Sequence, residues 1–235
     1  MVTDNFHHKN KKNKPLKNRS ALRILILTEG ETEQIYFSGL KNHHRLSNVD
    51  VLQCTWGTNA ANIYAEACSI GRKEFKAGIG YTHIFCVFDL DTAKTTNAFG
   101  VVETIYAKKH TFCSKMHAIV SNPCFDAWYL LHFLYSCAPF AAQGNKTIGN
   151  VVKSKLDKEW KNAFNTNYNE TISNTYQTLL EKSQAGHTNA DRLLQEQQVN
   201  QGNNPITNVH ELVKFLETLR GNPKPELNVT RISAI

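Results

Sequence analysis

Two acidic clusters directly follow apolar runs of the sequence. The first is Glu29-Gly-Glu-Thr-Glu33 and the second is Asp89-Leu-Asp91. Carboxylates this close together repel one another unless a cation neutralises them, and hard oxygen ligands suit Mg²⁺. We therefore predict that the two clusters together hold a divalent cation, Mg²⁺ with Mn²⁺ as an alternative ion. The competing interpretation is that each cluster consists of solvated loop acids.

Gly30 and Glu33 extend the first cluster into the element that follows it. A residue without Cβ lets the chain turn sharply, so that Glu29 points into a cleft and Glu33 reaches the first turn of a helix. Glu29 is predicted to act either as a metal ligand or as a general base. Glu33 is a second candidate catalytic carboxylate. The alternative is that its charge only complements the helix dipole.

A third segment with chemical potential runs from Ser121 to His132. Pro123 is typical of a first helical position, which predicts a helix whose N-terminus, with Ser121 and Asn122, binds a phosphate of nucleic acid. Plain helix caps are the alternative. Asp126 and His132 are candidate catalytic residues, although they point about 120° apart on a helix and form no simple pair. A half-buried structural histidine explains His132 equally well.

Three lysines, Lys153, Lys155 and Lys161, lie close in sequence to Trp160 and Phe164. Lysines contact phosphates and aromatic rings stack on bases, so this segment is a candidate for nucleic-acid binding. The alternative is a charged helix face over an aromatic core.

The elements that must position these residues alternate strand with helix. Apolar, β-branched runs predict strands, and apolar residues at helical spacing predict helices between them. Strands linked in this way pair in parallel, so the fold class is α/β, with an open, mostly parallel sheet flanked by helices. Ligands bind at the carboxyl ends of such strands, where both acidic clusters stand. The predicted strands are 22–27, 49–54, 82–88 and 116–120, and the predicted helices are 33–45, 59–76 and 99–110.

The pattern changes after Pro139. Residues 147–219 show helical periods and no convincing strand, and the last helix is predicted to begin at Asn208 with Glu211 completing a capping box. The residues after Gly221 are expected to form a frayed tail. We therefore predict three parts: a disordered basic tail (1–20), an α/β domain (21–138) and a helical C-terminal lobe (139–235).

The formal charge of +7 is concentrated at the N-terminus. Residues 1–20 contain six basic residues and one acidic residue, which leaves 21 basic and 19 acidic residues for the rest. Such a segment could follow nucleic-acid phosphates or serve only as a solubilising tail. No apolar run precedes Ala21 and none is long enough to span a bilayer, so no membrane attachment is expected. The six cysteines are at least 11 residues apart, which predicts reduced thiols and a cytoplasmic protein.

The motifs taken together resemble those of the RloB-like proteins. The resemblance spans residues 22 to 217. The matching segments are Glu29-Gly-Glu-Thr-Glu33 with Tyr36-Phe37, Phe88-Asp89-x-Asp91, Ser121-Asn-Pro-Cys-Phe-Asp126-x-Trp128-x3-His132, and Asn204-Pro205-Ile-Thr207-x-Val209-His-x-Leu212-Val213.

This resemblance implies a Toprim-like fold in which a strand-end glutamate, here Glu29, and an aspartate pair, here Asp89 and Asp91, bind Mg²⁺ for phosphodiester hydrolysis. The expected activity is that of a metal-dependent endonuclease in prokaryotic antiviral defence, including abortive infection. Its substrate is nucleic acid, with RNA, including tRNA, weakly favoured over DNA. A partner protein from the defence system and an oligomeric state are both compatible with the sequence.

Two departures from the family pattern keep other functions open. Thr92-Ala93-Lys94 stands where relatives often have an acid and a histidine, and Asp126 replaces the usual glutamate. A non-catalytic module that binds or senses nucleic acid is therefore an alternative. A less favoured one is a haloacid-dehalogenase-like phosphatase, whose aspartyl nucleophile normally ends the first strand of its domain, whereas Asp89 ends the third.

Overall fold

The sheet of the protein has five strands in the order β2-β1-β3-β4-β5. The first four strands along the chain pair in parallel, and β5 is antiparallel to β4. This computed structural model describes residues 22–90, 97–170, 172–221 and 225–232. The strands are β1 (Ile24–Thr28), β2 (Val49–Gln53), β3 (His83–Asp89), β4 (Lys115–Asn122) and β5 (Ile206–Thr207).

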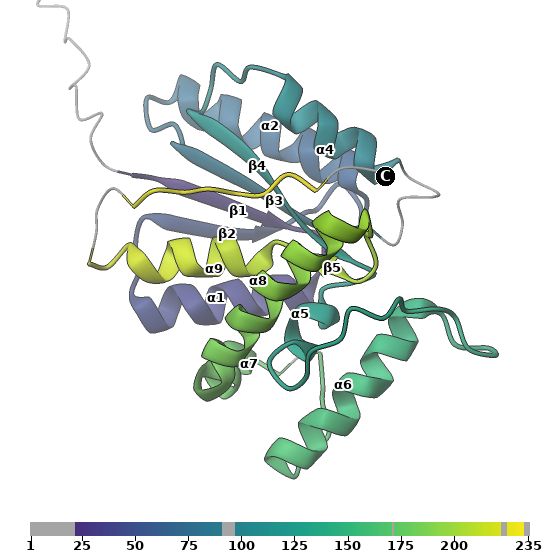
Figure 1. Cartoon of the computed structure of the whole chain (residues 1–235). Helices are drawn as coiled ribbons and strands as arrows, with labels where there is room; N and C mark the ends of the chain where they lie inside the picture. The colour runs from purple at the N-terminus through teal and green to yellow at the C-terminus, as the bar shows by residue number, and fades with distance from the viewer. Residues whose placement is uncertain (1–21, 91–96, 171, 222–224, 233–235) are drawn as a thin grey trace, which may run out of the picture.

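Helices cover both faces of the sheet, as Figure 1 shows. Alternate residues of β1 explain why: Ile24 and Ile26 belong to the core beneath α1 and α9, whereas Leu25 and Leu27 belong to the core beneath α2 and α4. A strand buried on both faces needs a continuous apolar run, which is the pattern of parallel sheets. The arrangement confirms the predicted α/β class and is consistent with a Toprim-like fold. The flanking helices are α1 (Glu31–His44), α2 (Ala60–Lys76), α4 (Ala98–Ala107) and α9 (Val209–Thr218).

The remaining helices come between β4 and β5 in the chain. Helix α6 projects away from the sheet in Figure 1 and is anchored by Trp160, which is 1% exposed. The expectation that no strand follows residue 147 is wrong, because Ile206 and Thr207 pair with the end of β4. A two-residue strand is too short to show an apolar periodicity, so it cannot be predicted from the sequence. These elements are α5 (Asp126–Leu130), α6 (Ile148–Phe164), α7 (Thr175–Leu179), the 3₁₀ helix η1 (Leu180–Lys182) and α8 (Ser183–Asn200).

The start of α9 is as predicted, but its capping box is not. The Asn208 side chain accepts a hydrogen bond from the Val120 N–H (2.8 Å) and donates to the Ala118 carbonyl (3.1 Å), so it ties the helix to β4. The Glu211 carboxylate instead accepts from the N–H and hydroxyl of Thr230, at 2.7 and 2.6 Å. Tertiary partners replace the local cap.

The expected frayed tail is also wrong for residues 225–232. This stretch runs beside the sheet in Figure 1, and Ile232 is 4% exposed within the core on the α2 side. Pro225 disfavours helix at the start of this stretch but not an extended segment that packs against the fold.

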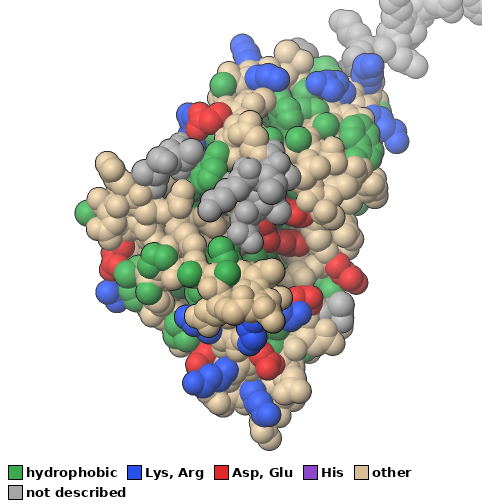
Figure 2. Space-filling model, turned by 90° about the vertical axis from the view of Figure 1, so that its right-hand side faces the viewer, with side chains coloured by type: hydrophobic (Ala, Val, Ile, Leu, Met, Phe, Trp, Pro, Cys, Tyr) green, Lys and Arg blue, Asp and Glu red, His purple; other side chains and the backbone are tan. Residues whose placement is uncertain are grey.

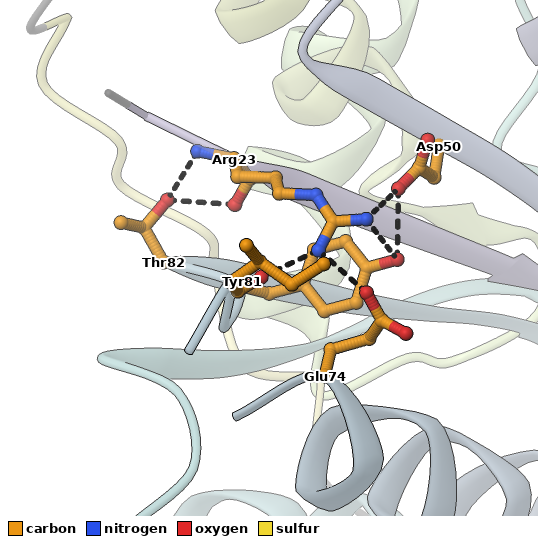
Figure 3. Close-up of polar contacts among 6 residues, drawn as sticks. Arg23, Asp50, Glu74, Tyr81 and Thr82 are labelled. Carbon is orange, nitrogen blue, oxygen red and sulfur yellow. Dashed lines mark hydrogen bonds and ion pairs between the residues drawn. The ribbon is translucent and has the colours of Figure 1, made fainter. Parts of the chain in front are cut away.

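A polar network fastens the amino ends of the strands, at the edge opposite the acidic clusters (Figure 3). The Arg23 guanidinium contacts the carboxylates of Asp50 (2.9 Å) and Glu74 (2.8 Å) and lies 4.2 Å from the centre of the Tyr81 ring. The Arg23 backbone donates to and accepts from the Thr82 hydroxyl, at 3.0 and 2.7 Å. One arginine therefore joins β1 to β2, α2 and the start of β3.

Candidate functional site

The carboxyl ends of β1 and β3 meet at Glu29. The Glu29 N–H donates to the Val87 carbonyl (3.0 Å), and its carboxylate Oε2 accepts from the Asp89 N–H (3.0 Å). Burial raises the pKa of Glu29, against the lowering effect of the Asp89 hydrogen bond. Figure 2 looks onto this edge of the molecule, and Asp and Glu side chains gather near the middle of the view. Glu29 and Asp89 are therefore neighbours through the Asp89 backbone, and their joint role as metal ligands stays a prediction.

Glu33 lies on the first turn of α1 and holds the turn before it. Its carboxylate accepts the Gly30 N–H at 3.0 Å, so the capping role proposed as the alternative for Glu33 is present. The φ of Gly30 is −126°, which any residue adopts; glycine matters here because an added Cβ would lie 3.0 Å from the Glu33 carboxylate. Burial, followed by the charges of Glu29 and Asp126, raises the pKa of Glu33 to about 7. Glu33 can therefore exchange a proton near neutral pH.

Asp126 adds a third carboxylate from the start of α5. Its Oδ1 accepts a 2.6 Å hydrogen bond from the Tyr168 hydroxyl, and burial raises its pKa. The Tyr168 N–H is itself held by the Asp157 carboxylate of α6, at 2.9 Å. The sequence gives no sign of this contact, because 42 residues separate the partners and no local pattern links them.

The Cys124 thiol is influenced by two of the acids. Burial has the largest effect and raises the pKa of this thiol, and the negative charges of Asp89 and Asp126 raise it further. All six cysteines are free thiols, as predicted, although Cys137 is exposed. The charges of Glu29 and Asp126 act on Glu33, and those of Asp89 and Asp126 act on Cys124, so we call Glu29, Glu33, Asp89 and Asp126 the acidic site.

His132 belongs to a different environment. Its ring is 3% exposed, its Nδ1 lies 3.0 Å from the Trp128 carbonyl, and it packs against Gly186 of α8. Burial lowers its pKa to about 4, so the ring is neutral at physiological pH. The side chains gathered around it include Trp128, Tyr176, His187 and Glu217 rather than the acids of the site. This placement favours the structural interpretation of His132 over the catalytic one.

The predicted helix start at Pro123 is wrong. Strand β4 continues to Asn122, the Asn122–Pro123 peptide bond is cis, and α5 begins at Asp126. The Ser121 hydroxyl lies 3.0 Å from that of Thr207, and the Asn122 amide donates to the Asn203 carbonyl at 2.5 Å. Pairing with β5 thus extends β4 by two residues and removes the helix N-terminus on which the predicted phosphate site depended.

The three predicted lysines of α6 do not form one surface. Lys153 pairs with Glu170 (2.6 Å), Lys155 lies 4.7 Å over the Phe140 ring, and Lys161 is exposed. Residues two apart on a helix point about 200° from each other, so Lys153 and Lys155 face different directions. Binding of nucleic acid by these lysines stays a prediction.

The donor set fits a divalent cation in part. Glu29 and Asp89 supply carboxylate oxygens, which Mg²⁺ prefers, and their neighbours Glu33 and Asp126 add negative charge in a partly buried setting. Asp91 lies outside the described residues. Among the residues that are described, no group of three or more His, Cys, Asp or Glu is arranged to hold a metal ion. Metal binding therefore stays a prediction.

The fold and the site define a mixed α/β protein with a carboxylate site at the carboxyl edge of a mostly parallel sheet. A family model described as RloB-like protein matches residues 24–216, and the chain belongs to this family. No curated protein and no solved structure matches the chain. Across the described ranges, no helix is long and apolar enough to cross a membrane.

Proposed function

We propose that the protein is a Mg²⁺-dependent nuclease that hydrolyses phosphodiester bonds. The observation that carries this proposal is the meeting of Glu29 with the end of β3, where its carboxylate accepts the Asp89 N–H at 3.0 Å. The ends of two strands thereby bring two acidic residues that are 60 positions apart in the chain next to each other at one edge of the sheet. Membership of the RloB-like family supports the same activity.

The residues of the site have separate proposed roles in binding the metal, transferring protons and positioning one another. Asp89, with Asp91 as predicted from the sequence, would hold Mg²⁺, which when bound polarises a phosphate and stabilises developing negative charge. Glu29 serves as a further ligand or as the base that takes a proton from water. Glu33 keeps the turn at Gly30 in place and, with its pKa near 7, can accept or return a proton. The Tyr168 hydroxyl fixes the direction of the Asp126 carboxylate.

The biological setting is part of the proposal. As an RloB-like protein, the chain would act in the cytoplasm of a prokaryote, in antiviral defence such as abortive infection, together with a partner protein of the same system. RNA, including tRNA, is the preferred substrate class, and DNA is the alternative. Lysines of α6 and of the basic N-terminal segment would contact phosphates.

The test is direct cleavage by the purified protein. Total tRNA, single-stranded RNA and DNA are incubated with Mg²⁺, with Mn²⁺ or with a chelator, and the products are separated on denaturing gels. We expect cleavage that needs the metal and falls at least about a hundredfold in Asp89→Asn, because that substitution removes a ligand charge. Glu181→Gln, an exposed carboxylate of η1, is the matched control and should cleave normally.

Two outcomes would change the assignment. Undiminished metal-dependent cleavage by Asp89→Ala would show that the chemistry lies elsewhere. Tight nucleic-acid binding without cleavage under any metal condition would favour the non-catalytic binding or sensing module. Circular dichroism of each variant separates loss of folding from loss of function.

A further inference from the structure

A short loop after β2 holds an exposed tryptophan at the same edge of the sheet as the acidic site. Strand β2 is the neighbour of β1, with Gln53 opposite Thr28, and the Cys54 N–H donates to the Thr28 carbonyl at 2.8 Å. The loop therefore leaves the sheet beside the strand end that carries Glu29. Trp56, two residues further on, is 54% exposed.

The backbone of this loop is held by a buried carboxylate. Glu66 of α2 accepts the Thr55 N–H (2.7 Å), the Thr55 hydroxyl (2.7 Å), the Trp56 N–H (3.1 Å) and the Cys54 thiol (3.0 Å). Burial raises the pKa of Glu66, but the hydrogen bonds from Cys54 and Thr55 outweigh it, so the pKa is lowered and the group stays ionised. Hydrogen bonds to a charged acceptor are among the stronger ones in proteins.

The other backbone group of Trp56 is held as well. Its carbonyl accepts from the Asn62 side chain at 2.9 Å, and Gly57 follows at φ +126°, a conformation that other residues rarely adopt. Both polar backbone groups of Trp56 are thus fixed to α2 while its indole faces solvent. Leaving a large aromatic surface in water sacrifices burial free energy, and a rigid mounting lowers the entropy lost when that surface binds a partner.

We propose that Trp56 stacks on a nucleobase of a single-stranded or locally unpaired nucleic acid whose backbone reaches the acidic site. The inference rests on the proposed function and names how that site holds its substrate. A ring held at the same edge of the sheet as the proposed cleavage site can accept the flat face of any base, and such stacking strengthens single-strand binding. Its neighbours in the loop, Thr55 and Thr58, are exposed and polar, and Leu52 of β2 is a further exposed apolar side chain, at 41%.

The three tryptophans make the proposal easy to observe. All three lie in the described part of the chain; Trp128 is 0% and Trp160 1% exposed, so intrinsic fluorescence quenched by an added ligand reports on Trp56. The probes are oligoadenylate and oligothymidylate of about ten nucleotides, added with a chelator so that binding is measured without cleavage. We expect both to quench the emission of the full-length protein.

Affinity is then measured by anisotropy of labelled oligonucleotides. Trp56→Ala should raise Kd roughly five- to a hundredfold, whereas Trp56→Phe, which keeps a stacking ring, should retain most of the affinity. The control is Phe75→Ala, because Phe75 is an equally exposed ring (50%) near the end of α2 that leads back to the opposite edge of the sheet. It should bind as the unaltered protein does.

The possible results separate this inference from the nuclease proposal. An unchanged Kd for Trp56→Ala, or no quenching by either oligonucleotide, overturns the stacking role even if Asp89-dependent cleavage is observed. Quenching together with weaker binding by Trp56→Ala supports stacking even if no cleavage is found. Thermal unfolding of Trp56→Ala and Trp56→Phe verifies that both variants fold.

Discussion

At the scale of single residues, the carboxylates of the acidic site differ in what surrounds them. Glu33 is 5% exposed and its carboxylate accepts a hydrogen bond from the Gly30 N–H. The Asp126 carboxylate accepts one from the Tyr168 hydroxyl. Burial penalises the charged form of each, and a hydrogen bond from a neighbour offsets part of that penalty. The proton affinity of each acid is therefore a property of its contacts, and substitution can measure it.

Glu33→Gln should make the protein more stable at neutral pH. The folded-state pKa of Glu33 is raised from 4.5 to about 7, so between these values the folded state keeps a proton that the unfolded state loses. Stability consequently falls as pH rises through this window and stays lower above it. Glutamine keeps the acceptor for the Gly30 N–H without the charge. We expect the variant to gain roughly 1 to 3 kcal/mol above pH 7 and to show a flatter profile from pH 4.5 to 7.

The measurement is the urea midpoint at a series of pH values, with a chelator present so that no cation shares the site. Glu31→Gln, an exposed acid of the same helix, is the control. If Glu33→Gln loses stability at pH 8, the carboxylate is stabilised in its charged form and the buried-acid account is wrong.

The substitution Tyr168→Phe should lower the free energy of unfolding, because it removes the hydrogen bond that holds the Asp126 carboxylate. The 2.6 Å hydrogen bond is largely shielded from water, and an acceptor left without its donor costs about 1 to 3 kcal/mol. A double-mutant cycle with Asp126→Ala, which removes the acceptor, isolates the pair in urea unfolding, and we expect a coupling energy of about 1 kcal/mol or more. Additive effects of the two substitutions would show that the contact contributes nothing.

At the scale of elements, α8 approaches α5 closely because a glycine stands at the crossing. A Cβ added at Gly186 would lie 2.8 Å from Nε2 of His132 and 2.9 Å from two ring carbons. The ring cannot withdraw easily, since its Nδ1 is bonded to the Trp128 carbonyl. The packing of the two helices thus depends on one missing side chain.

Gly186→Ala is therefore expected to destabilise the fold by about 1 to 3 kcal/mol, through overpacking. The matched control is Gly149→Ala in α6, where an added Cβ meets nothing within 4 Å. There alanine should gain up to about 1 kcal/mol from helix propensity. Thermal unfolding of the two variants should shift in opposite directions, and an equal gain for both would contradict the close contact.

At the scale of the whole molecule, the chain after residue 200 returns to the sheet. Strand β5 pairs with β4, α9 covers one face, and residues 225–232 lie alongside. Thr230 is the link, because it donates twice to Glu211 while its carbonyl accepts from Asn208 at 2.9 Å. An ion pair between Arg231 and Glu103 extends the contact to α4.

Deletion of residues 225–235 should lower the stability of the entire fold by about 2 to 4 kcal/mol. It removes the burial of Ile232 and leaves the half-buried Glu211 carboxylate without its donors. Thr230→Val, which keeps the backbone and the shape, should cost about 1 kcal/mol. Urea unfolding measures both, and an unchanged midpoint after the deletion would show that the segment does not stabilise the sheet.

The parallel core could be predicted from the sequence because its signals are local. Buried strands such as β1 and β3 are continuous apolar runs, and the helices between them repeat at 3.6 residues. Glu29 and Asp89 could be placed at one edge because the carboxyl ends of parallel strands coincide. These conclusions need only the neighbours of each residue in the chain.

The tertiary structure decided what depends on distant partners. Pairing with β5 kept Ser121 and Asn122 in a strand, burial against Gly186 set the character of His132, and Tyr168 reached Asp126 across 42 residues. Likewise, the pairing of β2 with β1 is what brings the loop of Trp56 to the edge of the sheet that carries Glu29. Hydrogen bonds and pKa values arise from groups that folding brings together, so a local pattern cannot contain them.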